Sequence, residues 1–133
     1  MDTFFEFEKS EQSLAILLVD DSSLLRQAYS HALKSWGYRV DVAVDGIAGF
    51  ECFQSGEYQM VITDYEMPSC NGVDFLKRAR NEVPSKAQIP FLLVTGTPLE
   101  ELGARLNGFA SVLTKPVGLR VLRAELDRFL MNF

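Results

Sequence analysis

Residues 60–68 read Met-Val-Ile-Thr-Asp-Tyr-Glu-Met-Pro, an apolar run that ends in Asp64 and leads into a turn. Three other apolar runs also end in residues that commonly bind ligands: Ala15 to Val19 before Asp20-Asp21, Phe91 to Val94 before Thr95, and Ser111 to Thr114 before Lys115-Pro116. In α/β proteins, ligands bind at the carboxyl ends of the strands. The pattern therefore predicts one site built from four strand ends.

The apolar runs alternate with helical patterns along the chain. We expect strands over residues 15–19, 38–44, 58–63, 90–95 and 110–115, each followed by a segment with apolar residues three and four apart. The continuous apolar character of the runs indicates burial on both faces, which is typical of a parallel sheet covered by helices. The sequence therefore predicts an α/β fold with a doubly wound, five-stranded parallel sheet in the order 2-1-3-4-5, as in flavodoxin, with the first and third strands central.

The helix boundaries carry their own signals. Ser22 and Ser23 are candidate N-caps for the first helix, and Gly37 is a candidate terminator. Apolar stripes also predict the last two helices. The fourth helix would contain Leu99, Leu102 and Leu106, with Pro98 near its first position. The last helix would contain Leu119, Leu122, Leu126, Phe129 and Phe133.

Length and charge bound the organisation of the chain. With 133 residues, 47% of them hydrophobic, one core is expected, over residues 14–133. Residues 1–13 hold four acids and one lysine, a net charge of -3 out of -5 for the whole chain, together with Phe4, Phe5 and Phe7. We expect these residues to form a flexible acidic and aromatic extension.

Composition also argues against several classes of protein. The basic residues form no long stripe, so direct nucleic-acid binding is not expected. Cys52 and Cys70 are too few for a disulfide framework or a cysteine-rich zinc site. The longest apolar runs are much shorter than the roughly 20 residues that span a bilayer. A cytoplasmic protein without membrane segments is expected.

The strand-end residues suit phosphoryl transfer. Asp20, Asp21 and Asp64 would repel one another at adjoining strand ends, and a bound Mg²⁺ would relieve that repulsion. Asp64 is the best candidate nucleophile because it ends the central strand. Lys115 and the Thr95 hydroxyl could then bind oxygens of the transferred phosphoryl group. Alone, Asp20-Asp21, Thr95 and Lys115 have plainer interpretations as a helix cap, a turn and a solvated strand end. Asp64 is harder to explain in this way, because an aspartate that ends an apolar run needs a partner when buried. The combination favours the site.

These residues resemble the response regulator receiver family of two-component signalling, the CheY-like phospho-acceptor domains. The resemblance covers residues 14–131 and lies in the motifs ILLVDDS (16–22), VITDYEMPSCNG (61–72), VTGT (94–97) and VLTKP (112–116). It implies that Asp64 accepts a phosphoryl group from the phosphohistidine of a histidine kinase or a histidine phosphotransfer protein. It also implies the Mg²⁺ ligands, namely Asp21 and Asp64 directly, Asp20 through water, and the backbone carbonyl of Glu66.

The resemblance further implies a switch, from which this chain departs at one position. Thr95 would move toward the phosphoryl group and Lys115 would pair with it. Three residues before that lysine, where the family usually has a Tyr or Phe that turns inward, this chain has Val112. By the same resemblance, Glu66 and Thr97 flank the access of water to the phosphoryl group.

Output is expected through protein contact. The implied target surface is the face of the fourth helix, fifth strand and fifth helix, where a partner would complete the shift that Val112 leaves partial. The chain is expected to be a monomer or a weak homodimer. It would catalyse only its own phosphorylation and dephosphorylation at Asp64, and is otherwise no enzyme.

Two alternatives keep the fold and change the function. The chain could be an interaction module that works without phosphorylation, although such modules usually lack one of the acids or the lysine. It could also be a phosphatase or phosphotransferase that uses Asp64 on small molecules, although no segment of substrate-cap length is inserted. A flavodoxin-type cofactor domain is weaker, because no glycine-rich loop follows the first strand.

Overall fold

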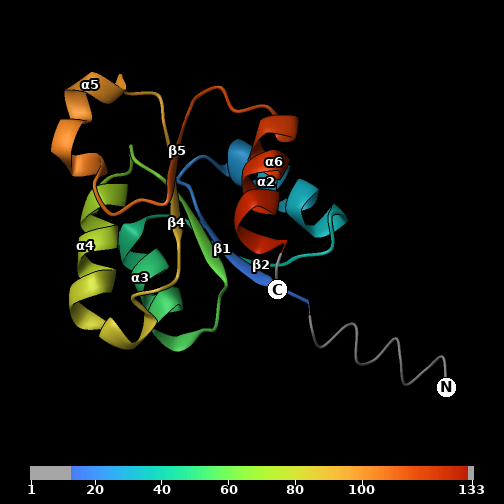
Figure 1. The fold of residues 1–133 in the computed structure, drawn as a ribbon, viewed down its shortest axis with the longest axis horizontal. Helices are drawn as coiled ribbons and strands as arrows, with labels where there is room; N and C mark the ends of the chain where they lie inside the picture. The colour runs from blue at the N-terminus through green and yellow to red at the C-terminus, as the bar shows by residue number, and fades with distance from the viewer. Residues whose placement is uncertain (1–12, 132–133) are drawn as a thin grey trace, which may run out of the picture.

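Five parallel strands form the centre of the computed structural model, which describes residues 13–131 (Figure 1). Their order is β2-β1-β3-β4-β5, which confirms the predicted α/β fold and strand order. The strands are β1 (Ala15–Val19), β2 (Arg39–Ala43), β3 (Met60–Asp64), β4 (Phe91–Thr95) and β5 (Ser111–Thr114).

Helices cover both faces of the sheet. One face carries α3 (Gly46–Ser55), α4 (Gly72–Glu82) and α5 (Leu99–Leu102), and the other carries α2 (Ser23–Ser35) and α6 (Leu119–Leu130) (Figure 1). Short 3-10 turns, η1 (Pro84–Lys86) and η2 (Gly103–Leu106), follow α4 and α5. Among the described residues, no helix is both long enough and apolar enough to span a bilayer.

The two faces bury separate cores. Under α3 and α4, the rings of Phe53, Phe75 and Phe91 meet at centroid distances of 5.1–6.4 Å, and none of the three is exposed. Under α2 and α6, the core contains Ile16, Leu18, Leu33, Leu122 and Leu126. Every residue of β1, β3 and β4 is buried, whereas β2 and β5 lie at the edges with partly exposed residues. This burial holds the strand ends of the site on a packed base.

Side-chain caps fix the turns that follow β1, β2 and β3. Ser22 Oγ accepts a hydrogen bond from the Leu25 amide (3.2 Å), and Asp45 and Asn71 cap α3 and α4 in the same way. Gly37, just after α2, has a φ of +99°, which favours glycine at this helix end. The Ser22 cap and the Gly37 terminator agree with the sequence prediction.

Two predicted helices differ from those observed. The fourth was expected to contain Leu106, yet α5 ends at Leu102, because Gly103 has a φ of +51° and the chain continues as a 3-10 turn. Pro98 is the N-cap of α5 and not its first residue. In α6 the buried stripe is Leu122, Leu126 and Leu130, and Leu119 is 47% exposed.

Some expectations lie outside the described residues. They are Phe133, which was assigned to the last apolar stripe, and the extension over residues 1–13, apart from Ser13. Both remain predictions.

Candidate functional site

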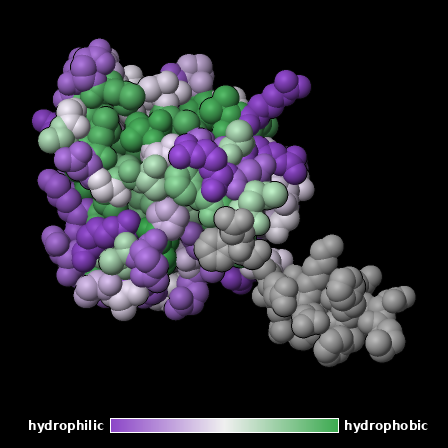
Figure 2. All heavy atoms as spheres, in the orientation of Figure 1, coloured by the Kyte–Doolittle hydropathy of each residue, from purple (hydrophilic) through white to green (hydrophobic). Residues whose placement is uncertain are grey.

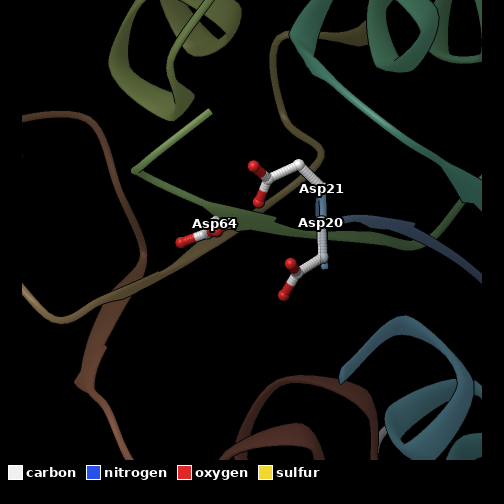
Figure 3. A group of neighbouring side chains, drawn as sticks. All are labelled: Asp20, Asp21 and Asp64. Carbon is white, nitrogen blue, oxygen red and sulfur yellow. The ribbon is translucent and has the colours of Figure 1, made fainter. Parts of the chain in front are cut away.

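The ends of β1 and β3 bring three carboxylates together. Asp20 and Asp21 follow β1, Asp64 ends β3, and the three side chains project toward one space (Figure 3). One oxygen from each lies within 4.8 Å of the others. Asp20 and Asp64 are buried, while Asp21 is exposed. The structure thus places the three predicted metal ligands side by side, in a cluster that is open to solvent at Asp21.

Asp20 is held by the turn that it begins. Its Oδ1 accepts a hydrogen bond from the Ser22 amide (2.9 Å), and its backbone carbonyl accepts one from the Arg26 guanidinium (2.9 Å). Burial raises the pKa of Asp20, while the Ser22 amide and the positive charge of Lys115 oppose that rise. The carboxylate is therefore fixed in position where its negative charge is costly.

Asp64 forms a salt bridge with Lys115, the only cation within salt-bridge distance of it among the described residues. The ammonium of Lys115 lies 3.0 Å from Asp64 Oδ1, and the Glu66 amide lies 3.3 Å from the same oxygen. Burial raises the pKa of Asp64 to about 7, against the lowering effect of Lys115 and with a further rise from the negative charge of Asp20. Further positive charge beside Asp64 would therefore favour its ionised form.

Lys115 comes from the loop after β5. Its amide donates to the carbonyl of Thr95 (2.8 Å), and its bond to Pro116 is cis. Burial opposes the charge of its ammonium, but the carboxylates of Asp64, Asp20 and Glu66 outweigh this effect and raise its pKa. Lys115 is thus a fixed positive charge directed at Asp64.

Thr95 and Glu66 form a second part of the site. The buried Thr95 hydroxyl donates to Glu66 Oε2 (2.5 Å), and the Thr97 hydroxyl donates to the same oxygen (2.6 Å). Burial opposes ionisation of Glu66, but hydrogen bonds from Thr95, Thr97 and the Gly96 amide lower the pKa of its carboxyl to about 2. Glu66 is therefore an anion that links β3 to the turn after β4.

The Glu66 side chain is the group that sequence reasoning placed least well. The family resemblance implied a metal ligand at its backbone carbonyl and a position beside the path of water, but no contact between its side chain and Thr95. Only its place two residues after Asp64 pointed to the site. Its partners lie at the end of β4 and in the turn after it, 29 and 31 residues away, and no local pattern reveals them.

Gly72 lies against the backbone of Asp64. A Cβ added at Gly72 would lie 2.4 Å from the Asp64 carbonyl oxygen and 2.9 Å from Leu93 Cδ1. We expect Gly72→Ala to reduce the free energy of unfolding by about 1–3 kcal/mol, because backbone or packed core must move. Urea denaturation followed by circular dichroism measures the loss.

Gly118→Ala is the matched control, since no atom lies within 4 Å of the added Cβ and the residue has an ordinary φ of -72°. It should lose less stability than Gly72→Ala. Equal losses in the two variants would contradict the close approach at Gly72.

Val112 lies beside a hollow and not inside the site. It lines a depression of about 350 Å³ with residues of β5 and α6 and with Leu99 of α5. Apolar side chains gather on this side of the molecule, around α5 and β5 (Figure 2). Phe109, which precedes β5, packs on the core under α3 and α4.

The donor set fits a magnesium ion. Three carboxylates supply hard oxygen ligands, and the exposure of Asp21 leaves room for water in the coordination shell. A divalent cation would also relieve the repulsion between Asp20 and Asp64, which raises the pKa of Asp64. The residues present are therefore suited to Mg²⁺.

The family model of the response regulator receiver domain matches residues 16–127. The chain belongs to the response regulator receiver family. It is therefore a receiver domain of two-component signalling systems. Receiver domains bind Mg²⁺ at an acidic pocket, and Asp20, Asp21 and Asp64 form such a cluster here. The predicted resemblance is confirmed.

A curated relative is also similar to the chain. The chain is 32% identical over 129 residues to the aerobic respiration control sensor protein ArcB of Escherichia coli K12. The aligned region covers 96% of this chain but only 17% of ArcB. The chain thus spans about a sixth of that relative's length.

Solved structures agree. The chemotaxis response regulator CheY4 of Vibrio cholerae is 30% identical, with a TM-score of 0.83 over 90% of this chain and 100% of that one. The response regulator TrrA of Thermotoga maritima, solved in complex with Mg²⁺-BeF, is 25% identical, with a TM-score of 0.79 over 88% of this chain and 99% of that one.

Proposed function

We propose that this receiver domain accepts a phosphoryl group on Asp64, with Mg²⁺ bound by the neighbouring carboxylates. The observation that carries the proposal is the position of Asp64, buried at the end of the central strand and 3.0 Å from the ammonium of Lys115. Asp20 and Asp21, which directly follow β1, lie beside it. A carboxylate in this setting can act as a nucleophile and not only as an ion-pair partner.

In the proposed reaction, an Asp64 carboxylate oxygen forms a bond to phosphorus while the bond between phosphorus and the leaving group breaks. The leaving group, the imidazole of a phosphohistidine, departs with the electron pair and takes up a proton. Lys115 and the Thr95 hydroxyl would stabilise the charge on the phosphoryl oxygens. Hydrolysis of the acyl phosphate by water would return the free carboxylate.

Asp21 and Asp64 would hold the Mg²⁺ directly, Asp20 through water, and the backbone carbonyl of Glu66 would complete the protein ligands. The bound ion supplies positive charge that neutralises the phosphoryl oxygens. The similarity of the chain to TrrA, which was solved in complex with Mg²⁺-BeF, supports the binding of Mg²⁺.

The proposed donor is a histidine kinase or a histidine phosphotransfer protein, in the cytoplasm. The proposed output surface is the face of α5, β5 and α6, where apolar residues line the hollow beside Val112. Because Val112 replaces the usual aromatic residue, phosphorylation alone would shift the switch only in part. A partner that binds the phosphorylated form more tightly would complete the shift by mass action.

The proposal is tested by intact mass after incubation with acetyl phosphate and Mg²⁺. We expect one phosphoryl adduct on the wild-type protein and none on Asp64→Asn, because the amide of the variant is not a nucleophile. Asp74→Asn is the matched control, since Asp74 is exposed on α4, and it should acquire the adduct.

The other outcomes identify the alternatives. No adduct on the wild-type protein would favour an interaction module that works without phosphorylation. Hydrolysis of small-molecule phosphate esters that depends on Asp64, beyond the slow turnover of acetyl phosphate that decay of the adduct itself allows, would favour an enzyme that acts on small molecules.

A further inference from the structure

The turn after β4 is bound to the Glu66 side chain through several donors. Besides the hydroxyls of Thr95 and Thr97, the amides of Gly96 and Thr97 donate to the Glu66 carboxylate at 3.3 and 3.2 Å. The other end of the same carboxylate, Oε1, lies 3.8 Å from the Lys115 ammonium. One anionic group thus lies between the turn and the lysine.

The Thr95 hydroxyl and the Lys115 ammonium are the groups assigned above to the phosphoryl oxygens. Lys115 is shared by Asp64 and Glu66, at 3.0 and 3.8 Å. The Thr95 hydroxyl has one proton and donates one hydrogen bond at a time. A phosphoryl oxygen on Asp64 and Glu66 Oε2 therefore compete for the same donor.

We propose that the Glu66 carboxylate is a built-in substitute for the phosphoryl group, which holds Thr95 in the unphosphorylated protein and has to be displaced when Asp64 is phosphorylated. This inference rests on the proposed function. Displacement costs the hydrogen bonds of Glu66, and its negative charge also repels the phosphoryl group, which carries about two negative charges. Glu66 thereby opposes phosphorylation and keeps the switch in its resting arrangement.

Two variants separate these two effects. Glu66→Gln removes the negative charge and weakens the hydrogen bonds. Glu66→Asp keeps the charge, but its side chain is one methylene shorter, so that it no longer reaches Thr95 and Thr97. If Glu66 acted by repulsion alone, Glu66→Asp would behave as the wild type does.

Beryllium fluoride with Mg²⁺, titrated by calorimetry, probes the phosphoryl position without turnover. We expect Glu66→Gln to bind it about 5- to 150-fold more tightly than the wild type, the range typical of coupled binding sites. Glu66→Asp and Thr97→Val, which removes one hydroxyl donor, should show smaller gains. Glu101→Gln, an exposed change on α5, should bind as the wild type does.

A second measurement uses the unphosphorylated protein alone. The amide resonances of Gly96 and Thr97 should move in both variants, because Glu66→Gln weakens their hydrogen-bond acceptor and Glu66→Asp draws it away. They should stay in place in Glu101→Gln.

The inference is overturned if these amide resonances stay in place in both Glu66 variants, or if both variants bind beryllium fluoride as the wild type does. The proposed function fails separately. In that case the wild-type protein binds no beryllium fluoride and acquires no phosphoryl adduct, whatever the amide resonances show.

Discussion

Asp64→Asn is expected to stabilise the metal-free protein at pH 8 and to change its stability little at pH 4. Asp64 is 2% exposed, and burial raises its pKa from 3.8 to about 7, against the opposing effect of Lys115. The folded protein therefore binds a proton more tightly at Asp64 than the unfolded chain does. Stability from this group is present at low pH and is lost as the pH rises from about 4 to about 7.

The expected size is a few kcal/mol at pH 8, since each tenfold change in proton affinity is worth about 1.4 kcal/mol. Asparagine stays neutral and avoids the loss. Urea denaturation at a series of pH values, with a chelator present, measures the difference between the two proteins. Glu51→Gln, an exposed change on α3, is the control and should leave the pH profile of stability unchanged.

Added Mg²⁺ should narrow the difference in stability between the two proteins. Because the ion binds the ionised carboxylates of the folded protein, it should stabilise the wild type at pH 8 by about 2.7 kcal/mol when its concentration is 100 times the dissociation constant. Asp64→Asn, which lacks one ligand, should gain less.

The metal-free pH series can contradict the prediction. If the metal-free wild type became more stable relative to Asp64→Asn between pH 4 and pH 8, burial would not disfavour the ionised form of Asp64.

Phe91→Ala is expected to reduce the free energy of unfolding by about 3–5 kcal/mol, because it leaves a cavity in a core that cannot collapse around it. Phe91 is fully buried on β4, and its ring meets those of Phe53 and Phe75 at 5.4 and 5.1 Å. The guanidinium of Arg80 also lies 5.0 Å from its ring centroid. The change therefore removes the contacts that join β4 to both α3 and α4.

Phe129→Ala is the matched control, since Phe129 on α6 is only partly buried. Chemical denaturation followed by circular dichroism should give it a clearly smaller loss. Phe91→Leu, which fills part of the cavity, should fall between the wild type and Phe91→Ala. Equal losses for the two alanine variants would show that the aromatic cluster is not the centre of this core.

The central strands could be predicted because burial on both faces of the sheet requires nearly every residue of the strand to be apolar. Met60, Val61 and Ile62 are all buried, so the apolar run reports the strand directly, and parallel topology then follows from the helices between the strands. The strand-end carboxylates were found for a related reason. Parallel strands put their carboxyl ends at one edge of the sheet, so order along the chain places Asp20, Asp21 and Asp64 together.

Other features depend on conformations or contacts that local patterns do not encode. The spacing of Leu99, Leu102 and Leu106 fits a helix, but the left-handed conformation of Gly103 ends it. The contact of Glu66 with Thr95 joins residues 29 positions apart, and glutamate two residues after an aspartate indicates no partner. Residue type and spacing therefore locate the base of the site, meaning the buried strand-end residues such as Asp64 and Thr95, better than its rim, meaning Glu66 and Lys115.

The difference between base and rim has an evolutionary consequence. Asp64 and Thr95 belong to buried strands, whereas Glu66 is exposed and Lys115 comes from a connecting loop. Substitutions at buried strand ends threaten folding as well as chemistry, whereas an exposed residue such as Glu66 can change at little cost to the core. If Glu66 opposes phosphorylation as proposed, natural variation would adjust how strongly a receiver responds by exchanging exposed residues of the site alone, while the same protein scaffold serves pathways that need different sensitivities.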